Sequence, residues 1–135
     1  MSTGMVSDST LNLAQKALDG LSLRRDVISQ NIANVDTPGY QAQQVNFETA
    51  LQSAINSSGT LPMTTTNDRH ETGLQSEKTN MLEIGLRKGG STRADGNNVN
   101  IDQELEQMTE TGVSYQALTT AITKKLSLLK AIAER

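Results

Sequence analysis

The chain has 135 residues, with 12 basic and 15 acidic side chains, a net charge of −3 and no cysteine. One modest domain with this mild acidic balance does not suit a nucleic-acid partner, and the missing cysteine excludes disulfides and thiol chemistry. One phenylalanine, two tyrosines and no tryptophan leave few large side chains for a self-sufficient core, so we expect the chain to complete its burial against neighbours.

A first long helix is predicted within residues 1–35. Apolar residues recur from Leu11 to Val35 at alternating spacings of three and four, a near-heptad stripe interrupted at Arg25. Asp8 or Ser9 is expected to cap its start. The residues of this helix that we expect to pack are Leu18, Leu21, Ile28 and Ile32.

A turn and an irregular, partly extended region are predicted for residues 36–99. Pro38 disfavours helical backbone at Thr37, and the pair Pro38-Gly39 suits the centre of a type II turn. Further along we expect a short helix at 43–56, turns at 57–80 and a short strand at 81–86.

A second long helix is predicted over residues 101–133 of the terminal segment 100–135. Asn100 or Asp102 can cap its start, and the acids near the start and lysines near the end match the helix dipole. Gly112 costs about 1 kcal/mol there, so we expect it to mark a close backbone approach. The packing residues expected here are Leu105, Met108, Tyr115, Ile122, Leu126 and Leu129.

The two stripes share one spacing, which predicts a mainly α fold. The terminal helices should pack as an antiparallel, coiled-coil-like hairpin, so that segments 1–35 and 100–135 form one structural unit. Burial within such a pair is small against the entropy of ordering it, so assembly should supply further stability.

No catalytic, cofactor or metal site is predicted. His70 has no second histidine or cysteine with which to bind a metal, and no activated serine motif is present. Residues 95–100 match a calcium loop only in part, because Val99 and Asn100 stand where an oxygen ligand and a glycine are needed.

The most informative stretch is Asn-Ile-Ala-Asn-Val-Asp-Thr-Pro-Gly-Tyr at residues 31–40. Within it, Asn34 is suited to a left-handed conformation that ends the helix, and Tyr40 is placed to contact a neighbour. The stretch resembles the Asn-x-Ala-Asn-x-x-Thr-Pro-Gly-Tyr element of the flagellar rod and hook axial protein family. Asp-Gly-Asn-Asn-Val at 95–99 and Tyr-Gln-Ala at 115–117 are also similar to family segments, and the order and short length most resemble proximal-rod members.

The resemblance implies a structural subunit of the proximal rod in the periplasm. Subunits would leave the cell through the flagellar type III apparatus without a cleaved signal, consistent with the lack of a secretory signal in the first 30 residues. They would stack helically into a tube that transmits torque and leaves an export channel. The residues expected at the turn and at subunit contacts are Asn31, Asn34, Asp36, Thr37, Pro38, Gly39 and Tyr40.

The partners that the resemblance implies are all parts of the flagellum. They are further copies of the chain, the rod proteins FlgC, FlgF and FlgG, the adaptor FliE, the MS ring and the export gate; no nucleic acid or small-molecule substrate is expected. Phe47 and Leu51 match the short pattern that early export substrates present to this gate, or are simply two apolar residues one turn apart on a core-facing helix.

Other functions stay open at this point. The chain could be another rod component such as FlgC, or a cytoplasmic helical adaptor or export chaperone. A peptidoglycan-cleaving enzyme would need a carboxylate in a cleft, whereas the acids here fall on predicted helix faces.

Overall fold

The computed structural model describes residues 3–58 and 82–134. Within them the elements are, in order, α1 (Thr3–Ala33), β1 (Gln43–Val45), α2 (Phe47–Ser58), β2 (Ile84–Leu86) and α3 (Ile101–Ala133). The predicted mainly α fold with two long terminal helices is confirmed. Most of the turn-rich stretch 57–80, His70 included, lies outside the described residues.

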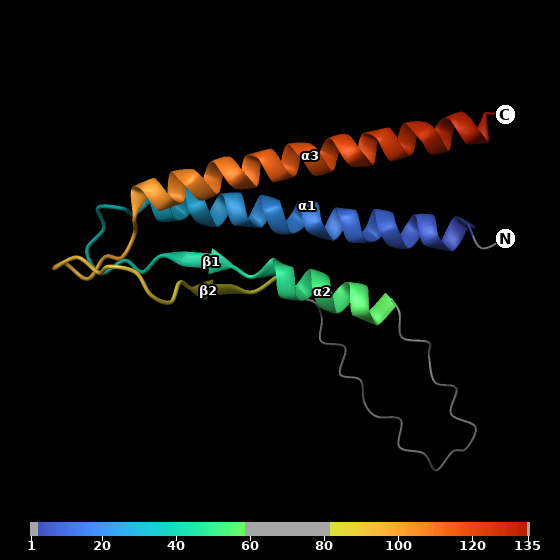
Figure 1. Ribbon diagram of the computed structural model, residues 1–135. Helices are drawn as coiled ribbons and strands as arrows, with labels where there is room; N and C mark the ends of the chain where they lie inside the picture. Colours follow the sequence, from blue (N-terminus) through green and yellow to red (C-terminus); the bar gives the residue numbers. More distant parts are fainter. Residues whose placement is uncertain (1–2, 59–81, 135) are drawn as a thin grey trace, which may run out of the picture.

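The elements are arranged around α1, which lies between α3 on one side and the strands and α2 on the other (Figure 1). α1 and α3 run antiparallel, so the two chain ends lie at the same end of the hairpin (Figure 1). In the part of the chain that the structure describes, no helix is both long and apolar enough to cross a membrane.

α1 starts earlier than predicted. Its first residue is Thr3, so Asp8 and Ser9 lie inside the helix, and the prediction that one of them caps its start is wrong. Helical backbone continues toward the N-terminus because residues 3–8 contain no proline, and their single glycine costs only about 1 kcal/mol in a helix.

α1 ends at Ala33, and Asn34, which follows it, does not adopt the left-handed backbone conformation. Glycines are the only described residues with positive φ, so the conformation predicted for Asn34 is wrong. Asn34 instead donates from its backbone and side-chain nitrogens to the carbonyl of Gln30, at 3.1 and 2.8 Å. A side chain that bonds its own helix end removes the need for the strained conformation.

The Pro-Gly turn forms as predicted. Tyr40 N donates to Thr37 O at 3.2 Å, and Gly39 has a φ of 73°. A type II turn needs positive φ at its third position, which glycine adopts without a steric penalty.

The short helix predicted at 43–56 begins only at Phe47, because residues 43–45 form the strand β1. β1 pairs antiparallel with β2, with Gln44 opposite Gly85. On its other edge, α1 supplies side-chain partners: Asn31 bonds both backbone groups of Gln43, and Arg24 donates to Val45 O. This strand could not be predicted locally, because its hydrogen bonds come from distant residues.

α3 has the predicted bounds and cap. The Asn100 side chain accepts from Asp102 N at 3.1 Å and Gln103 N at 3.4 Å. Its inward side, however, is not the predicted stripe: Glu104 and Thr111 are the buried residues, whereas Leu105 is 52% exposed. The inward residues keep the same alternation of four and three but run through Glu104, Met108, Thr111, Tyr115, Leu118 and Ile122, so the predicted stripe shares only Met108, Tyr115 and Ile122 with the inner side.

The residues predicted to pack divide into three groups. Leu21 and Ile28 are buried, and the half-buried members are Leu18, Ile32, Met108, Tyr115 and Ile122. Leu105, Leu126 and Leu129 are exposed, by 52%, 48% and 37%. Packing of these three leucines is therefore absent from the single chain and stays a prediction for the assembled state.

The core gathers where α2 meets α1. Its buried residues are Leu21, Val27, Val45 and Phe47, and the half-buried residues against it are Leu23, Leu82, Tyr115 and Leu118. Phe47 packs directly on Gly20, where an added Cβ would lie 2.8 Å from the ring. The close approach expected at Gly112 is not found among the described residues, since none of their atoms lies within 4 Å of a Cβ placed there. The glycine that does permit close packing is Gly20.

Two glycine substitutions should therefore have opposite effects. Gly20→Ala is expected to destabilise the chain by about 1–3 kcal/mol, because the methyl group overlaps the Phe47 ring. Gly112→Ala is expected to stabilise it by about 0.5–1 kcal/mol, because the site is open and alanine favours helix. Urea unfolding followed by circular dichroism measures both, and equal effects would contradict the packing described.

Candidate functional site

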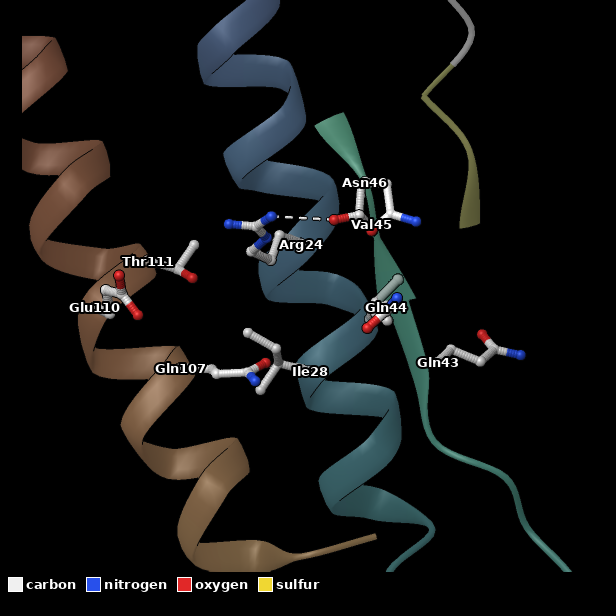
Figure 2. A pocket seen from close by; sticks show the side chains of 10 residues that line it. Arg24, Ile28, Gln43, Gln44, Val45, Asn46, Gln107, Glu110 and Thr111 are labelled. Atoms are coloured by element: carbon white, nitrogen blue, oxygen red, sulfur yellow. Dashed lines mark hydrogen bonds between the residues drawn. The ribbon is translucent and has the colours of Figure 1, made fainter. Parts of the chain in front are cut away.

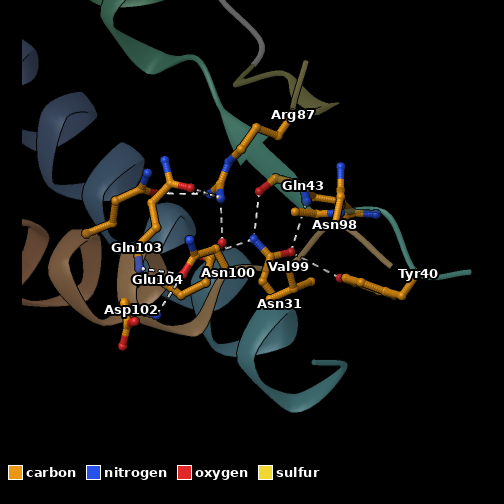
Figure 3. Close-up of polar contacts among 12 residues, drawn as sticks. Asn31, Tyr40, Gln43, Arg87, Asn98, Val99, Asn100, Asp102, Gln103 and Glu104 are labelled. Carbon is orange, nitrogen blue, oxygen red and sulfur yellow. Dashed lines mark hydrogen bonds and ion pairs between the residues drawn. The ribbon is translucent and has the colours of Figure 1, made fainter. Parts of the chain in front are cut away.

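The two family-like motifs meet in space. Residues 31–43, at the end of α1, lie against residues 87–104, which lead into α3, and we call this region the motif junction (Figure 3). It joins segments about sixty residues apart in the sequence. Three buried polar side chains, Asn31, Asn97 and Glu104, make many of the hydrogen bonds that hold it.

Asn31 uses its whole hydrogen-bonding capacity. Its Nδ2 donates to Gln43 O at 2.8 Å and to Glu104 Oε2 at 3.2 Å. Its Oδ1 accepts from Gln43 N at 2.9 Å and from the Tyr40 hydroxyl at 3.2 Å. A primary amide has two donors and two acceptor positions, so this fully buried side chain is satisfied in a single orientation.

Glu104 is fully buried at the first turn of α3 and forms an ion pair with Arg87. Arg87 Nη1 donates to Glu104 Oε1 at 2.6 Å, and Nη2 donates to Gln107 Oε1 at 3.2 Å. Arg87 N also donates to Ala42 O at 2.8 Å, which continues the pairing of β1 and β2. The carboxylate thus connects α3, the β2 segment and, through Asn31, α1 (Figure 3).

Tyr40 closes one side of this network. Burial, followed by the negative charge of Glu104, raises the pKa of the Tyr40 hydroxyl above its usual value. A tyrosine hydroxyl is protonated at neutral pH even at its usual pKa, so this one remains a donor to Asn31, and the upward shift extends that state to higher pH.

Asn97 binds the carbonyl groups at the end of α1. Its Nδ2 lies 2.9 Å from Asn34 O, 3.1 Å from Val35 O and 2.8 Å from Thr37 O. Its Oδ1 accepts from Val99 N at 2.8 Å. A helix end leaves carbonyl groups without helical partners, and one amide from a distant motif supplies donors here.

The turns of the two motifs also pair through their backbones. Gly39 N donates to Asp95 O at 2.9 Å, and Asn98 N donates to Tyr40 O at 3.3 Å. Asn98 Oδ1 accepts from Ala42 N at 2.6 Å. The short turn 95–98 therefore fixes the direction in which the chain leaves α1.

The structure divides the predicted contact residues. Asn31 is buried, and Asn34 and Tyr40 are half-buried in contacts of their own chain. The four residues that remain exposed are Asp36, Thr37, Pro38 and Gly39. Arg87, Asn97 and Glu104 were not predicted as site residues, although Asn97 belongs to the second motif at 95–99, which signalled that this region matters.

A groove of about 210 Å³ lies beside the junction, between α1, β1 and α3 (Figure 2). Its wall is mostly polar and includes Arg24, Gln44, Gln107 and Glu110. Among the described residues no group of three or more histidine, cysteine or acidic side chains is placed to hold a metal ion. The arrangement is one of structural hydrogen bonds.

Known proteins resemble the chain along nearly its whole length. A family model described as flagella basal body rod protein matches residues 6–41. The flagellar basal body rod protein FlgB of Aeromonas hydrophila is 35% identical, with 93% of each chain covered. Proteins of the same name from Proteus mirabilis and Bacillus subtilis are each 31% identical, covering 95% and 91% of this chain and 96% and 92% of their own.

Replacing the side-chain nitrogen of Asn97 with an oxygen tests the junction. Asn97→Asp should destabilise the chain by about 3 kcal/mol or more, because a buried carboxylate would face three carbonyl oxygens in place of a donor. Asn98→Asp is the matched control: it keeps the oxygen that accepts from Ala42 N, so stability should change by less than about 1 kcal/mol. Chemical unfolding of both variants is the measurement, and equal losses would contradict the assigned role of Asn97.

Proposed function

Since the chain belongs to the FlgB family of flagellar basal body rod proteins, we propose that it is a structural subunit of the proximal rod. Copies stack helically into a tube that transmits torque and leaves a channel for later subunits. The observation that carries this proposal is the 35% identity over 93% of both chains, which includes both long helices and both halves of the junction.

The hairpin suits a torque-bearing subunit. α3 has 33 residues, and a helix of this length spans roughly 50 Å. The junction ties the end of α1 to the start of α3 through buried polar contacts, whose geometry tolerates little displacement. A load on one helix therefore passes to the other through short, satisfied bonds.

We also propose that the chain is not an enzyme. Its buried carboxylate, Glu104, is already paired with Arg87 and bonded to Asn31. A general acid or base needs access to a substrate proton. Each buried polar side chain of the junction serves instead to join elements of the chain.

Contacts between copies are assigned to surfaces that the single chain leaves exposed. One is the turn from Asp36 to Gly39, which belongs to the junction but leaves all four of its residues exposed. The other comprises Leu105, Leu126 and Leu129 on α3. Contacts that repeat without closing produce an extended tube.

The partners proposed are other basal body components in the periplasm. They are copies of the chain, the rod proteins FlgC, FlgF and FlgG, the adaptor FliE, the MS ring and, during unprocessed export, the type III export gate. The other readings of the sequence, a component such as FlgC or a cytoplasmic adaptor, are not favoured, because the relatives reported above share the name FlgB.

Removal of the chain tests its function. A strain without it should build membrane rings that carry no rod or hook and should not swim, because a missing subunit at the base blocks everything assembled above. Electron microscopy of isolated basal bodies is the measurement, with restoration of the gene as the control. Complete rods in the deletion strain would contradict the proposed function.

Phe47 and Leu51 are proposed as the segment that the export gate recognises. Phe47 is buried against Gly20, with the Arg24 guanidinium 4.5 Å from the centre of its ring. Arg24 also pairs with Glu48. Recognition of Phe47 would therefore need the contact between α1 and α2 to be open.

Phe47→Ala should lower export of the chain while pre-exported subunit still assembles. The loss of a buried ring also destabilises the fold, by about 3–5 kcal/mol. Glu104→Ala is the matched control, because it destabilises by a similar amount without changing Phe47. Equal export of the Phe47 variant and the parent chain, measured as secreted protein, would contradict recognition at Phe47.

A further inference from the structure

The groove beside the motif junction combines an apolar floor with polar walls (Figure 2). Its floor is α1, where Val27 and Ile28 are each only 2% exposed. One wall is α3 and the other is β1 (Figure 2). A helix with its side chains is about 10–12 Å wide, so a space of about 210 Å³ admits one long side chain and not another helix.

The two arginines near this groove are already neutralised by their own chain. Arg87 forms an ion pair with the buried Glu104. Arg24, which lines the groove, forms an ion pair with Glu48 and also donates to a backbone carbonyl of β1. Neither guanidinium therefore leaves an uncompensated positive charge for a ligand.

Two acceptors on α3 lack partners among the described residues. Glu110 lines the groove and forms no ion pair there. Thr111 is only 4% exposed and points from α3 toward α1 (Figure 2), but its hydroxyl makes no hydrogen bond within the described part of the chain. The hydroxyls of Thr109 and Thr119 on the same helix instead bond the carbonyl four residues earlier. A buried hydroxyl without a partner is costly, so Thr111 points to a ligand that supplies a donor.

We propose that this groove binds a lysine side chain of another protein molecule. The methylene stem lies over Val27 and Ile28, and the ammonium group donates to the Glu110 carboxylate and the Thr111 hydroxyl. An ammonium group has three donors and no acceptor, and it is compact enough for a narrow site. A bare cation would leave the apolar floor uncovered, whereas a lysine covers it with its stem.

The lysine comes from outside the chain. Lys88 follows Arg87, whose side chain points to α3, and successive side chains of an extended segment point to opposite sides. Lys88 therefore points away from the groove. The other lysines in the described ranges lie on the two long helices, and none of them lines the groove: Lys16, Lys124, Lys125 and Lys130. That the partner is a neighbour in the basal body rests on the proposed function.

A titration of the full chain with Nα-acetyl-lysine amide tests the site, followed through the backbone amide signals of Val45 and Thr111 in NMR spectra. The lysine probe should shift these signals to saturation, whereas Nα-acetyl-norleucine amide, with a similar stem and no charge, should not. Glu110→Gln should weaken binding by about tenfold or more, because a hydrogen bond to a charged group is lost. Glu106→Gln, one turn earlier and outside the groove lining, is the matched control and should bind like the parent chain.

Thr111→Val separates a binding role from a structural one. Valine has nearly the shape of threonine but no hydroxyl. Since this hydroxyl has no partner in the described part of the chain, its removal should leave the urea midpoint unchanged or raised. Binding of the lysine probe should fall several-fold in the same variant. A lowered midpoint with unchanged probe binding would make Thr111 structural and overturn the site.

Carbodiimide coupling of isolated basal bodies tests the site in the assembly. The reagent joins a carboxylate and an amine that are in contact, with loss of water. Digestion and mass spectrometry should then find Glu110 linked to a lysine of another molecule, and the linked peptide identifies that molecule. Links at the exposed Glu106 with none at Glu110 would overturn the proposal.

The remaining outcomes also separate the site from the function. Binding of Nα-acetyl-glutamate amide in place of the lysine probe would make Arg24 the attracting group and overturn the proposal. Lysine binding that survives Glu110→Gln, or equal binding of the norleucine probe, would do the same. Each of these results leaves the rod subunit in place, whereas rods in a strain without the chain would overturn the proposed function itself.

Discussion

The primary amide of Asn31 is the point on which the rest of the structure depends. It is fully buried on α1, yet it bonds the backbone of β1, the hydroxyl of Tyr40 and the carboxylate of Glu104 on α3. A buried amide with all positions used has one acceptable orientation, and each partner is placed by it. Glu104 is in turn neutralised by Arg87, so a buried charge is tolerated where three elements meet.

This constraint explains why a chain with few large apolar residues still has a defined shape. The apolar core is small and lies at one place, where α2 packs on α1 around Gly20 and Phe47. At the closed end of the hairpin, polar contacts do the positioning that apolar packing does in larger domains. Such contacts add less net stability than burial but define geometry more strictly, because an unpaired buried group is costly.

The other end of the hairpin is different in kind. Beyond Ile122, α3 buries none of its large apolar residues, and Leu126, Leu128 and Ile132 face solvent in the single chain. One end of the subunit is held by buried polar contacts, and the other end leaves apolar side chains exposed. This difference matches an assembly in which neighbours complete the burial. The polar junction would then set the register of each subunit, while the exposed helix surfaces join one subunit to the next.

The sequence by itself determined the features that depend on neighbouring residues: the two long helices, the Asn100 cap and the Pro38-Gly39 turn. Local propensity and spacing are enough for these. Only the tertiary structure decided that residues 43–45 form a strand, that Asn34 stays out of the left-handed region, and that Glu104 and not Leu105 faces inward. Those outcomes depend on Asn31, Arg87 and Asn97 meeting partners across 12 to 73 residues of sequence, a separation at which spacing along the chain carries no information about contact.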